Sequence, residues 1–402
     1  MQDNEKKPAL RFKGFTDPWE QRKLGDVADI VGGGTPSTNN PNYWDGDIDW
    51  YAPAEIAGQI YFDSSQRKIT EQGYENSSAK MLPPGTVLFT SRAGIGKTAI
   101  LSKKGCTNQG FQSIVPYNDE LDSYFVFSRT DELKQYGELV GAGSTFVEVS
   151  GKQMAAMNLK MPTTIEEQQT IGRFFKRLDT LITLHQRKYE KLVNIKKSML
   201  DKMFPKNGAS VPEIRFKGFT DPWEQRKLKE LYFQLTERNT DLLPYQKTLS
   251  VATMSFKTDG NGAADTSLAN YKRLRTGDIA FEGHTSKEFR YGRFVLNDVG
   301  DGIMSPRFSA LRPLHEMPIN FWKYYIHYEP IMRKVLVNST KAGTMMNELV
   351  INDFLQGSIL VPSMTEQQAI GRFFKQLDTL ITLHQREHIK PILEVKRVKR
   401  NE

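Results

Sequence analysis

The sequence predicts an α+β protein in which one mixed fold of strands and helices is used twice and two long helices pair antiparallel as a coiled coil. Three observations support this fold class. Two blocks of sequence recur almost unchanged, the stretches between them differ while keeping their glycines, and each second block has the heptad pattern of a long helix. The order of segments is therefore variable, constant, variable, constant.

The first constant block, Arg11–Leu24, recurs without change as Arg215–Leu228. Within it Asp17 can cap a helix, Pro18 suits the first helical position, and Glu20 suits the third. We therefore expect a short helix to begin at this point in each copy.

The second constant block, Ile171–Arg187, recurs as Ile370–Arg386 with a single difference, Arg177 in one copy and Gln376 in the other. Each copy follows a capping box, Thr164 to Glu167 or Ser363 to Glu366, which comes just after a proline that ends a strand. The first copy predicts a helix over residues 164–204, about 60 Å long at 1.5 Å per residue. A helix of this length needs a partner to cover its apolar side.

That apolar side follows a heptad pattern in both copies, and its residues are called the seam below. Antiparallel pairing of the two helices would bury the seam, partly against itself. His185 and His384 occupy equivalent heptad positions, and we interpret them as packing residues rather than metal ligands. In the second copy the sequence changes after Arg386, and Pro391 is expected to interrupt the helix. The seam residues are Ile171, Phe175, Leu178 and Ile182, with Ile370, Phe374, Leu377 and Ile381.

The two variable stretches, 25–162 and 229–362, keep the same spacing of glycines although most side chains differ. This pattern indicates one fold that presents two different surfaces. The strands expected in them are Thr86–Thr90, Thr98–Ser102 and Phe111–Pro116, and then Asp278–Gly283, Gly292–Asn297 and Arg307–Pro313.

The net charge of +8 favours a polyanionic partner, and if that partner is DNA, the loops between these strands are where differing side chains could enter a groove. Asn and Gln can bind adenine bidentately, Arg can bind guanine, and Ser, Thr and Lys can hold phosphates. The candidates are Thr90, Ser91, Arg92, Lys97, Asn108, Gln109, Ser144 and Thr145 in the first half, and Glu282, His284, Lys287, Arg290, Arg293, Arg307, Lys341 and Thr344 in the second.

Composition limits the class of protein. The 402 residues carry a net charge of +8, which favours a polyanionic partner. A single cysteine, Cys106, excludes an intramolecular disulfide and fits a reducing cytosol. No apolar run is long enough to cross a membrane, and residues 1–7 have no signal-peptide character. We therefore expect a cytoplasmic protein.

No motif for catalysis withstands inspection. The segment Gly94 to Thr98 resembles the end of a phosphate-binding loop, but Ser91 stands where that motif needs a glycine. A glycine turn between strands is the better interpretation. The sequence contains no Ser/His/Asp or Cys/His arrangement, and its six histidines are scattered. We therefore predict a chain that is not an enzyme and holds no cofactor or metal.

This order of segments resembles the specificity subunits of type I restriction–modification enzymes. The residues that carry the resemblance are the glycine-rich start of the first variable stretch, Gly32 to Trp50, and the segment that opens each long helix, Glu167 to Arg187 and Glu366 to Arg386. The resemblance covers nearly the whole chain, and the helix segment is its specific part.

The resemblance implies two target-recognition domains, 1–162 and 207–362, separated by two conserved antiparallel helices, 163–206 and 363–402. Each domain would read half of a bipartite, asymmetric target in double-stranded DNA. The helices would set the distance between the halves and dock two modification (methyltransferase) subunits. S-adenosylmethionine, ATP and Mg would then belong to the modification and restriction subunits, and this chain would carry no active site. The changed end of the second helix is a departure from the family pattern.

Two other functions compete with DNA recognition. A self-contained nuclease would need the catalytic residues that the sequence lacks. A coiled-coil adaptor that binds proteins alone would show weak DNA affinity without sequence preference.

Overall fold

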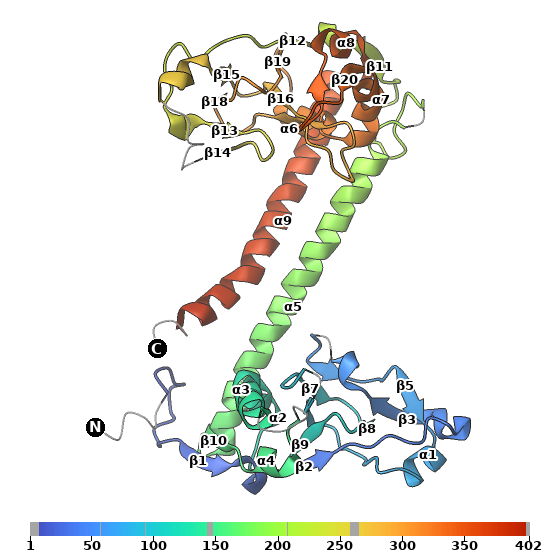
Figure 1. Ribbon diagram of the computed structural model, residues 1–402, viewed down its shortest axis with the longest axis vertical. Helices are drawn as coiled ribbons and strands as arrows, with labels where there is room; N and C mark the ends of the chain where they lie inside the picture. Colours follow the sequence, from blue (N-terminus) through green and yellow to red (C-terminus); the bar gives the residue numbers. More distant parts are fainter. Residues whose placement is uncertain are drawn as a thin grey trace. The chain divides into compact units, whose positions relative to one another are not determined.

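The computed structural model describes the backbone of residues 8–398 except 57, 93, 143–147, 207 and 258–264, and it describes no side chain at 265–266 or beyond 386. The chain divides into two compact units, unit 1 (Met1–Leu181) and unit 2 (Ile182–Glu402). Helix α5 (Ile165–Lys202) begins in unit 1 and ends in unit 2 (Figure 1).

Unit 1 is built on a five-stranded sheet in the order β2-β9-β6-β7-β4, a three-stranded sheet β5-β3-β8 and the pair β1-β10. Four short helices accompany the start of α5. The strands are β1 (Glu20–Lys23), β2 (Ala28–Gly32), β3 (Trp44–Tyr51), β4 (Tyr61–Phe62), β5 (Arg67–Ile69), β6 (Val87–Phe89), β7 (Thr98–Leu101), β8 (Cys106–Thr107), β9 (Gln112–Pro116) and β10 (Asn158–Met161), and the helices are α1 (Glu71–Glu75), α2 (Ser123–Ser128), α3 (Thr130–Gly141) and α4 (Gly151–Ala155).

Unit 2 has a four-stranded sheet in the order β12-β19-β16-β17 and four two-stranded pairs, β11-β22, β13-β14, β15-β18 and β20-β21. Its strands are β11 (Glu224–Lys227), β12 (Tyr232–Gln234), β13 (Leu249–Ser250), β14 (Ser255–Phe256), β15 (Lys272–Leu274), β16 (Ile279–Glu282), β17 (Arg293–Leu296), β18 (Gly302–Met304), β19 (Ala310–Pro313), β20 (Thr340–Lys341), β21 (Glu348–Leu349) and β22 (Ser358–Val361), and its helices are α6 (Ile319–Tyr325), α7 (Glu329–Ser339), α8 (Ile351–Gln356) and α9 (Met364–Val398).

The two units repeat one topology. The strand order β2-β9-β6-β7 of unit 1 matches β12-β19-β16-β17 of unit 2, and β1-β10 matches β11-β22. Equivalent turns even share their unusual backbone: φ is +86° at Gly85 and +95° at Gly277, and +91° at Gly96 and +87° at Gly292. Because side chains other than glycine rarely adopt these angles, the glycines persist while their neighbours change. The α+β fold used twice is confirmed, and the six predicted strands lie where expected.

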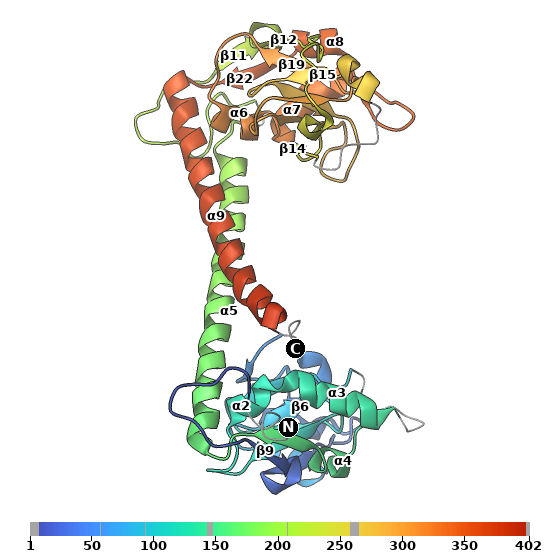
Figure 2. The same cartoon turned by 90° about the vertical axis from the view of Figure 1, so that its left-hand side faces the viewer.

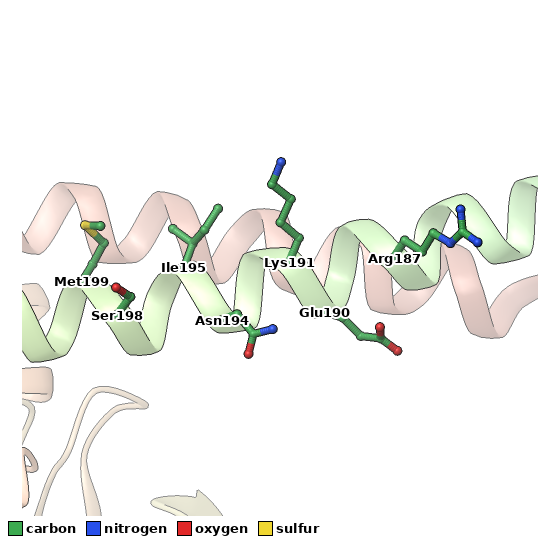
Figure 3. A pocket seen from close by; sticks show the side chains of 7 residues that line it. All are labelled: Arg187, Glu190, Lys191, Asn194, Ile195, Ser198 and Met199. Carbon is green, nitrogen blue, oxygen red and sulfur yellow. The ribbon is translucent and has the colours of Figure 1, made fainter.

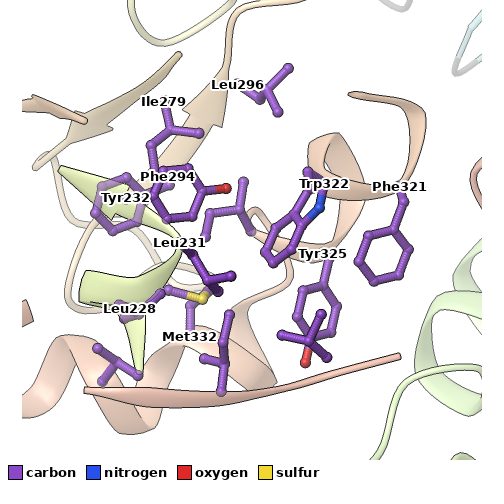
Figure 4. Packing of buried hydrophobic residues seen from close by; sticks show 14 of the residues in the cluster. Leu228, Leu231, Tyr232, Ile279, Phe294, Leu296, Phe321, Trp322, Tyr325 and Met332 are labelled. Atoms are coloured by element: carbon purple, nitrogen blue, oxygen red, sulfur yellow. The ribbon is translucent and has the colours of Figure 1, made fainter. Parts of the chain in front are cut away.

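The core of unit 2 is aromatic. Phe321, Trp322 and Tyr325 of α6 lie against strand residues such as Tyr232 and Phe294, all with almost no exposed surface (Figure 4). The ring of Tyr232 meets that of Trp322 edge to face, with 5.9 Å between centroids. Rings in this geometry add to the stability gained from burial, so α6 is fixed firmly beneath the sheet.

The predicted short helix in the first constant block is wrong. Residues 20–23 form strand β1, which pairs with β10, and residues 224–227 form β11, which pairs with β22. Asp17 and Pro18 are suitable for a helix start, but pairing with a strand more than a hundred residues away outweighs that local preference.

The same block holds the start of α5. Arg11 donates from Nε and Nη2 to the two carboxylate oxygens of Glu167, each at 2.7 Å, and Trp19 Nε1 donates to Glu167 at 3.2 Å. Thr164 accepts from the Glu167 backbone N–H at 3.4 Å. The capping box is therefore half formed: its hydroxyl caps the helix, while its carboxylate binds Arg11. Unit 2 repeats this bidentate pair with Arg215 and Glu366.

Within unit 2, the second half of α5 lies antiparallel to α9 (Figure 2). His185 Nδ1 is 3.0 Å from His384 Nδ1, Lys196 is 2.6 Å from Asp378, and the rings of Phe204 and Phe374 are 6.0 Å apart. Partner numbers fall along α9 as they rise along α5, which confirms antiparallel pairing. A different side of α5, from Arg187 to Met199, borders a shallow hollow of about 490 Å³ (Figure 3).

Burial varies along the predicted seam. Ile370, Phe374 and Leu377 are buried, and Ile171, Leu178, Ile182 and Ile381 are half-buried. Phe175, however, is 37% exposed, so its predicted burial is wrong.

The predicted break at Pro391 is also wrong, because the backbone of α9 continues as a helix to Val398. A proline removes one hydrogen bond, and a helix can continue past it when the rest of the ladder stays intact.

Candidate nucleic-acid interface

In unit 1 the turn between β6 and β7 is held together by the side chain of Thr90. Its Oγ1 donates to the Gly94 carbonyl at 2.7 Å and accepts from the Lys97 backbone N–H at 2.9 Å. Thr90 and Ser91 have almost no exposed surface. In this structure these two candidates shape the loop rather than form its surface. Gly94 and Gly96 take positive φ, so the phosphate-loop-like segment is the glycine turn that the sequence favoured.

Arg92 and Asn108 are brought together across Gly110. A Cβ atom at Gly110 would lie 3.0 Å from Asn108 Oδ1 and 3.6 Å from Arg92 Nε. The Gly110 backbone N–H donates to Asn108 Oδ1 at 2.7 Å, which fixes the amide but leaves its Nδ2 group without a hydrogen-bond partner among the described residues. An arginine and an asparagine, two side chains of the kinds that can bind base edges, thus lie close together beside this loop.

The neighbouring Gln109 is exposed and contacts Thr35 Oγ1. Thr35 follows two glycines that the fold requires: a Cβ at Gly33 would lie 2.0 Å from the Asn108 carbonyl oxygen, and one at Gly34 2.3 Å from the Ser78 carbonyl carbon. Residues 33–35 therefore pack behind the loop that carries Asn108. Thr35 was missed as a candidate because its proximity to Gln109 depends on tertiary structure.

Two further candidates of unit 1 stand apart from this cluster. Lys97 is exposed beside α3, where a Cβ at Gly96 would lie 2.4 Å from Lys134 Cγ. Two lysines therefore share this edge of the unit, which suits a phosphate backbone. Ser144 and Thr145 lie outside the described residues.

In unit 2 a charged cluster occupies the end of β16 and the start of β17. The Glu282 carboxylate is buried, contacts His284 Nδ1 and lies 3.5 Å from Arg293 Nε. Arg293 also donates to the Ala252 carbonyl at 3.1 Å and lies 5.0 Å above the Phe289 ring. A buried carboxylate that holds two cationic or donor groups fixes their direction, as in a recognition site.

A second set of candidates borders a cavity of about 440 Å³. Arg307 and Thr344 line it, together with Asn347, whose backbone N–H donates to the Gly283 carbonyl at 2.9 Å. Asn347 was not among the sequence candidates, because it lies beside Gly283 only through a contact between residues that are more than sixty positions apart in the sequence. Lys287, Arg290 and Lys341 are exposed.

These groups can donate and accept hydrogen bonds and attract anions. Among the described residues no three His, Cys, Asp or Glu side chains gather as a metal site. Burial raises the pKa of the Cys106 thiol to about 12, so this thiol is a poor nucleophile at neutral pH. No described helix is long and apolar enough to span a membrane.

The two units thus repeat one fold, and the described loops of each unit bear different polar groups. Residues 16–194 match the family described as the type I restriction modification DNA specificity domain, in line with the resemblance noted in the sequence. The chain is 36% identical over 180 residues to the type I restriction enzyme MjaIX specificity subunit of Methanocaldococcus jannaschii, and 28% identical over 200 residues to the EcoR124I/EcoR124II specificity subunit of Escherichia coli.

These matches span 44% and 45% of this chain and 41% and 48% of the two relatives, so the chain spans less than half the length of the curated relatives it matches. The fold as a whole is also known. A type I restriction–modification S subunit from M. genitalium superposes with a TM-score of 0.59 over 98% of this chain and 97% of that one, at 12% identity.

Proposed function

We propose that this chain is the DNA specificity subunit of a type I restriction–modification complex. Each unit reads one half of a bipartite target in double-stranded DNA. The chain is divided as the sequence analysis expects, with recognition domains at 1–162 and 207–362 and conserved helices at 163–206 and 363–402. Modification and restriction subunits bind this scaffold and supply the chemistry.

One observation carries this proposal: equivalent loops on the same frame bear different base-reading groups. After β6 the first unit presents Arg92, which lies close to Asn108 from the segment between β8 and β9. After β16 the second unit presents His284, and both His284 and Arg293, the first residue of β17, lie against buried Glu282. Arg and Asn suit guanine and adenine, while a carboxylate-held His and Arg suit a different sequence. A shared structural role would keep these residues alike, whereas two half-sites require them to differ.

Catalysis is assigned to the partner subunits. S-adenosylmethionine would serve the methyltransferase, and ATP and Mg would serve the restriction subunits. The purified chain alone is therefore expected neither to methylate nor to cut DNA. Methylation or cleavage of DNA by the homogeneous chain without its partner subunits would contradict this assignment.

The test is to map methylated adenines in cells that express this chain with its modification subunits. Asn108→Ala should relax one half of the target by about 1–3 kcal/mol of discrimination and leave the other half unchanged. Arg307→Ala in unit 2 is the matched control and should affect the opposite half. Relaxation of both halves by either variant would show that the two units do not read separately.

A further inference from the structure

The hairpin β20-β21 of unit 2 carries an exposed methionine at its tip. The Met345 side chain is 78% exposed, whereas its neighbour Met346 is half-buried and places its sulfur 3.9 Å from Arg307 Nη2. Met346 therefore packs onto unit 2, while Met345 contributes little to the folding of the unit. An apolar side chain exposed in this way gains free energy when another surface covers it.

The backbone that carries Met345 is fixed at three points. At the base of the hairpin β20 pairs antiparallel with β21. At its side the Asn347 backbone N–H donates to the Gly283 carbonyl at 2.9 Å, and Asn347 Nδ2 donates to the Arg290 carbonyl at 3.4 Å. Inside the turn a Cβ at Gly343 would lie 2.3 Å from a backbone carbonyl oxygen, so the loop is tightly closed. A side chain that projects from a fixed backbone loses less conformational entropy when it is buried in a partner.

The surroundings of the tip are cationic and belong to the candidate DNA interface. Gly283, to which the hairpin is bonded, directly follows Glu282, the buried carboxylate of the charged cluster at the end of β16. Three exposed cations form part of the hairpin or contact it: Arg290, Arg307 and Lys341. An apolar tip among cations complements a surface with anions outside and apolar faces inside, which is what the phosphates and stacked bases of a duplex present.

The cavity of about 440 Å³ lies beside this tip. Met345 borders it together with Phe308, and the Arg307 guanidinium lies 5.3 Å above the Phe308 ring. Glu348, the acidic residue of the hairpin, also borders the cavity and stands opposite Lys341 in the strand register, so a cation balances its charge. Because protein side chains do not fill this space, a duplex bent around the tip can approach it without a clash.

We infer that Met345 is a wedge that inserts between two stacked base pairs in the half-site read by unit 2. The inference rests on the proposed function and adds to it a residue that reads the shape of DNA. Methionine is one of the apolar side chains that enter base steps, and such insertion partly unstacks the step and kinks the duplex by about 20–90°. The wedge favours steps that unstack easily, a pyrimidine followed by a purine above all, and needs no hydrogen bond to a base.

The test uses the complex of the chain with its modification subunits and a duplex that contains the target mapped from methylated adenines. Dyes at the two ends of the duplex report bending by energy transfer, and anisotropy reports binding. We expect Met345→Ala to reduce the bend and to weaken binding about tenfold, because the buried apolar contact is lost. Met345→Leu should keep both, since leucine is also an effective wedge. Val337→Ala, at an exposed apolar residue of α7 in the same unit, is the matched control and should change neither.

A second measurement locates the unstacked step. The fluorescence of 2-aminopurine rises when it is unstacked, so it replaces in turn each adenine of the half-site that is not itself methylated. We expect a rise beside one step, lost in Met345→Ala and kept in Met345→Leu and Val337→Ala.

The outcomes separate this inference from the proposed function. If the unaltered complex binds its target and Met345→Ala leaves both the bend and the affinity unchanged, the wedge is wrong while the proposed function stands. If Met345→Ala instead prevents assembly with the modification subunits, as sedimentation would show, Met345 contacts a protein and the inference is overturned. If the unaltered complex shows no preference for the mapped target, the proposed function fails and the wedge fails with it.

Discussion

Phe175 and Phe374 form a matched pair for measuring how much tertiary packing stabilises the repeated helix. They occupy the same position in two copies of one sequence, yet Phe374 is fully buried and Phe175 is 37% exposed. The Phe374 ring lies 5.1 Å from that of Tyr324, 5.4 Å from Phe373 and 6.0 Å from Phe204. Truncation there leaves a cavity in a close-packed core.

Phe374→Ala should therefore lower the free energy of unfolding of unit 2 by about 3–5 kcal/mol, the usual cost of deleting a buried ring. Phe175→Ala should lower that of unit 1 by roughly 1 kcal/mol or less, as expected of a partly exposed side chain. The two units are large enough to unfold in separate steps, so each transition must be fitted by itself.

The assay is denaturant unfolding followed by tryptophan fluorescence, with pulse proteolysis to assign each transition to a unit. Trp223 and Trp322 report on unit 2, and Trp19, Trp44 and Trp50 on unit 1. If the two variants lower the free energy of unfolding of their units by amounts that agree within about 1 kcal/mol, the reasoning is refuted, because equal decreases would mean that the two phenylalanines are equally buried in solution.

Three other predictions follow from particular contacts. Arg11→Lys should lower the free energy of unfolding by about 1–3 kcal/mol, because an ammonium group cannot make the two parallel hydrogen bonds to buried Glu167. Once Arg11→Lys is present, adding Glu167→Gln should lower the free energy of unfolding no further, and a double-mutant cycle would measure this. Burial lowers the pKa of His327 below its ordinary 6.5, so the stability of unit 2 should be greatest above about pH 6.5 and fall as the pH drops through that value. His327→Gln should flatten this dependence in unfolding curves at pH 5.5 and 7.5, and an unchanged slope would contradict the assignment. Gly110→Ala should impair DNA binding through one half-site, since its Cβ would lie 2.8 Å from Pro53 Cγ; binding at the unmutated level would show that the loop adjusts.

Much of the local structure was accessible from the sequence. The six predicted strands and both long helices appear in the structure, because alternation of apolar residues, glycine turns and heptad spacing act over a few residues. The glycines at 85 and 277, and at 96 and 292, mark the same turns in both copies since their positive φ excludes most other residues. The duplication itself gave the repeated topology, because similar patterns in one chain fold alike.

What the sequence could not supply depends on contacts between distant segments. Asp17 and Pro18 favour a helix locally, but the pairing of β1 with β10 places a strand there instead. Asn108 and Arg92 become neighbours across Gly110, and Asn347 reaches Gly283, through folding alone. Phe175 and Phe374 stand in nearly identical sequences and differ in burial, and Phe374 packs against Phe204, Tyr324 and Phe373. By itself, then, the sequence determined the elements and their repetition, whereas the tertiary structure decided which side chains meet, since burial depends on what the rest of the chain brings to each surface.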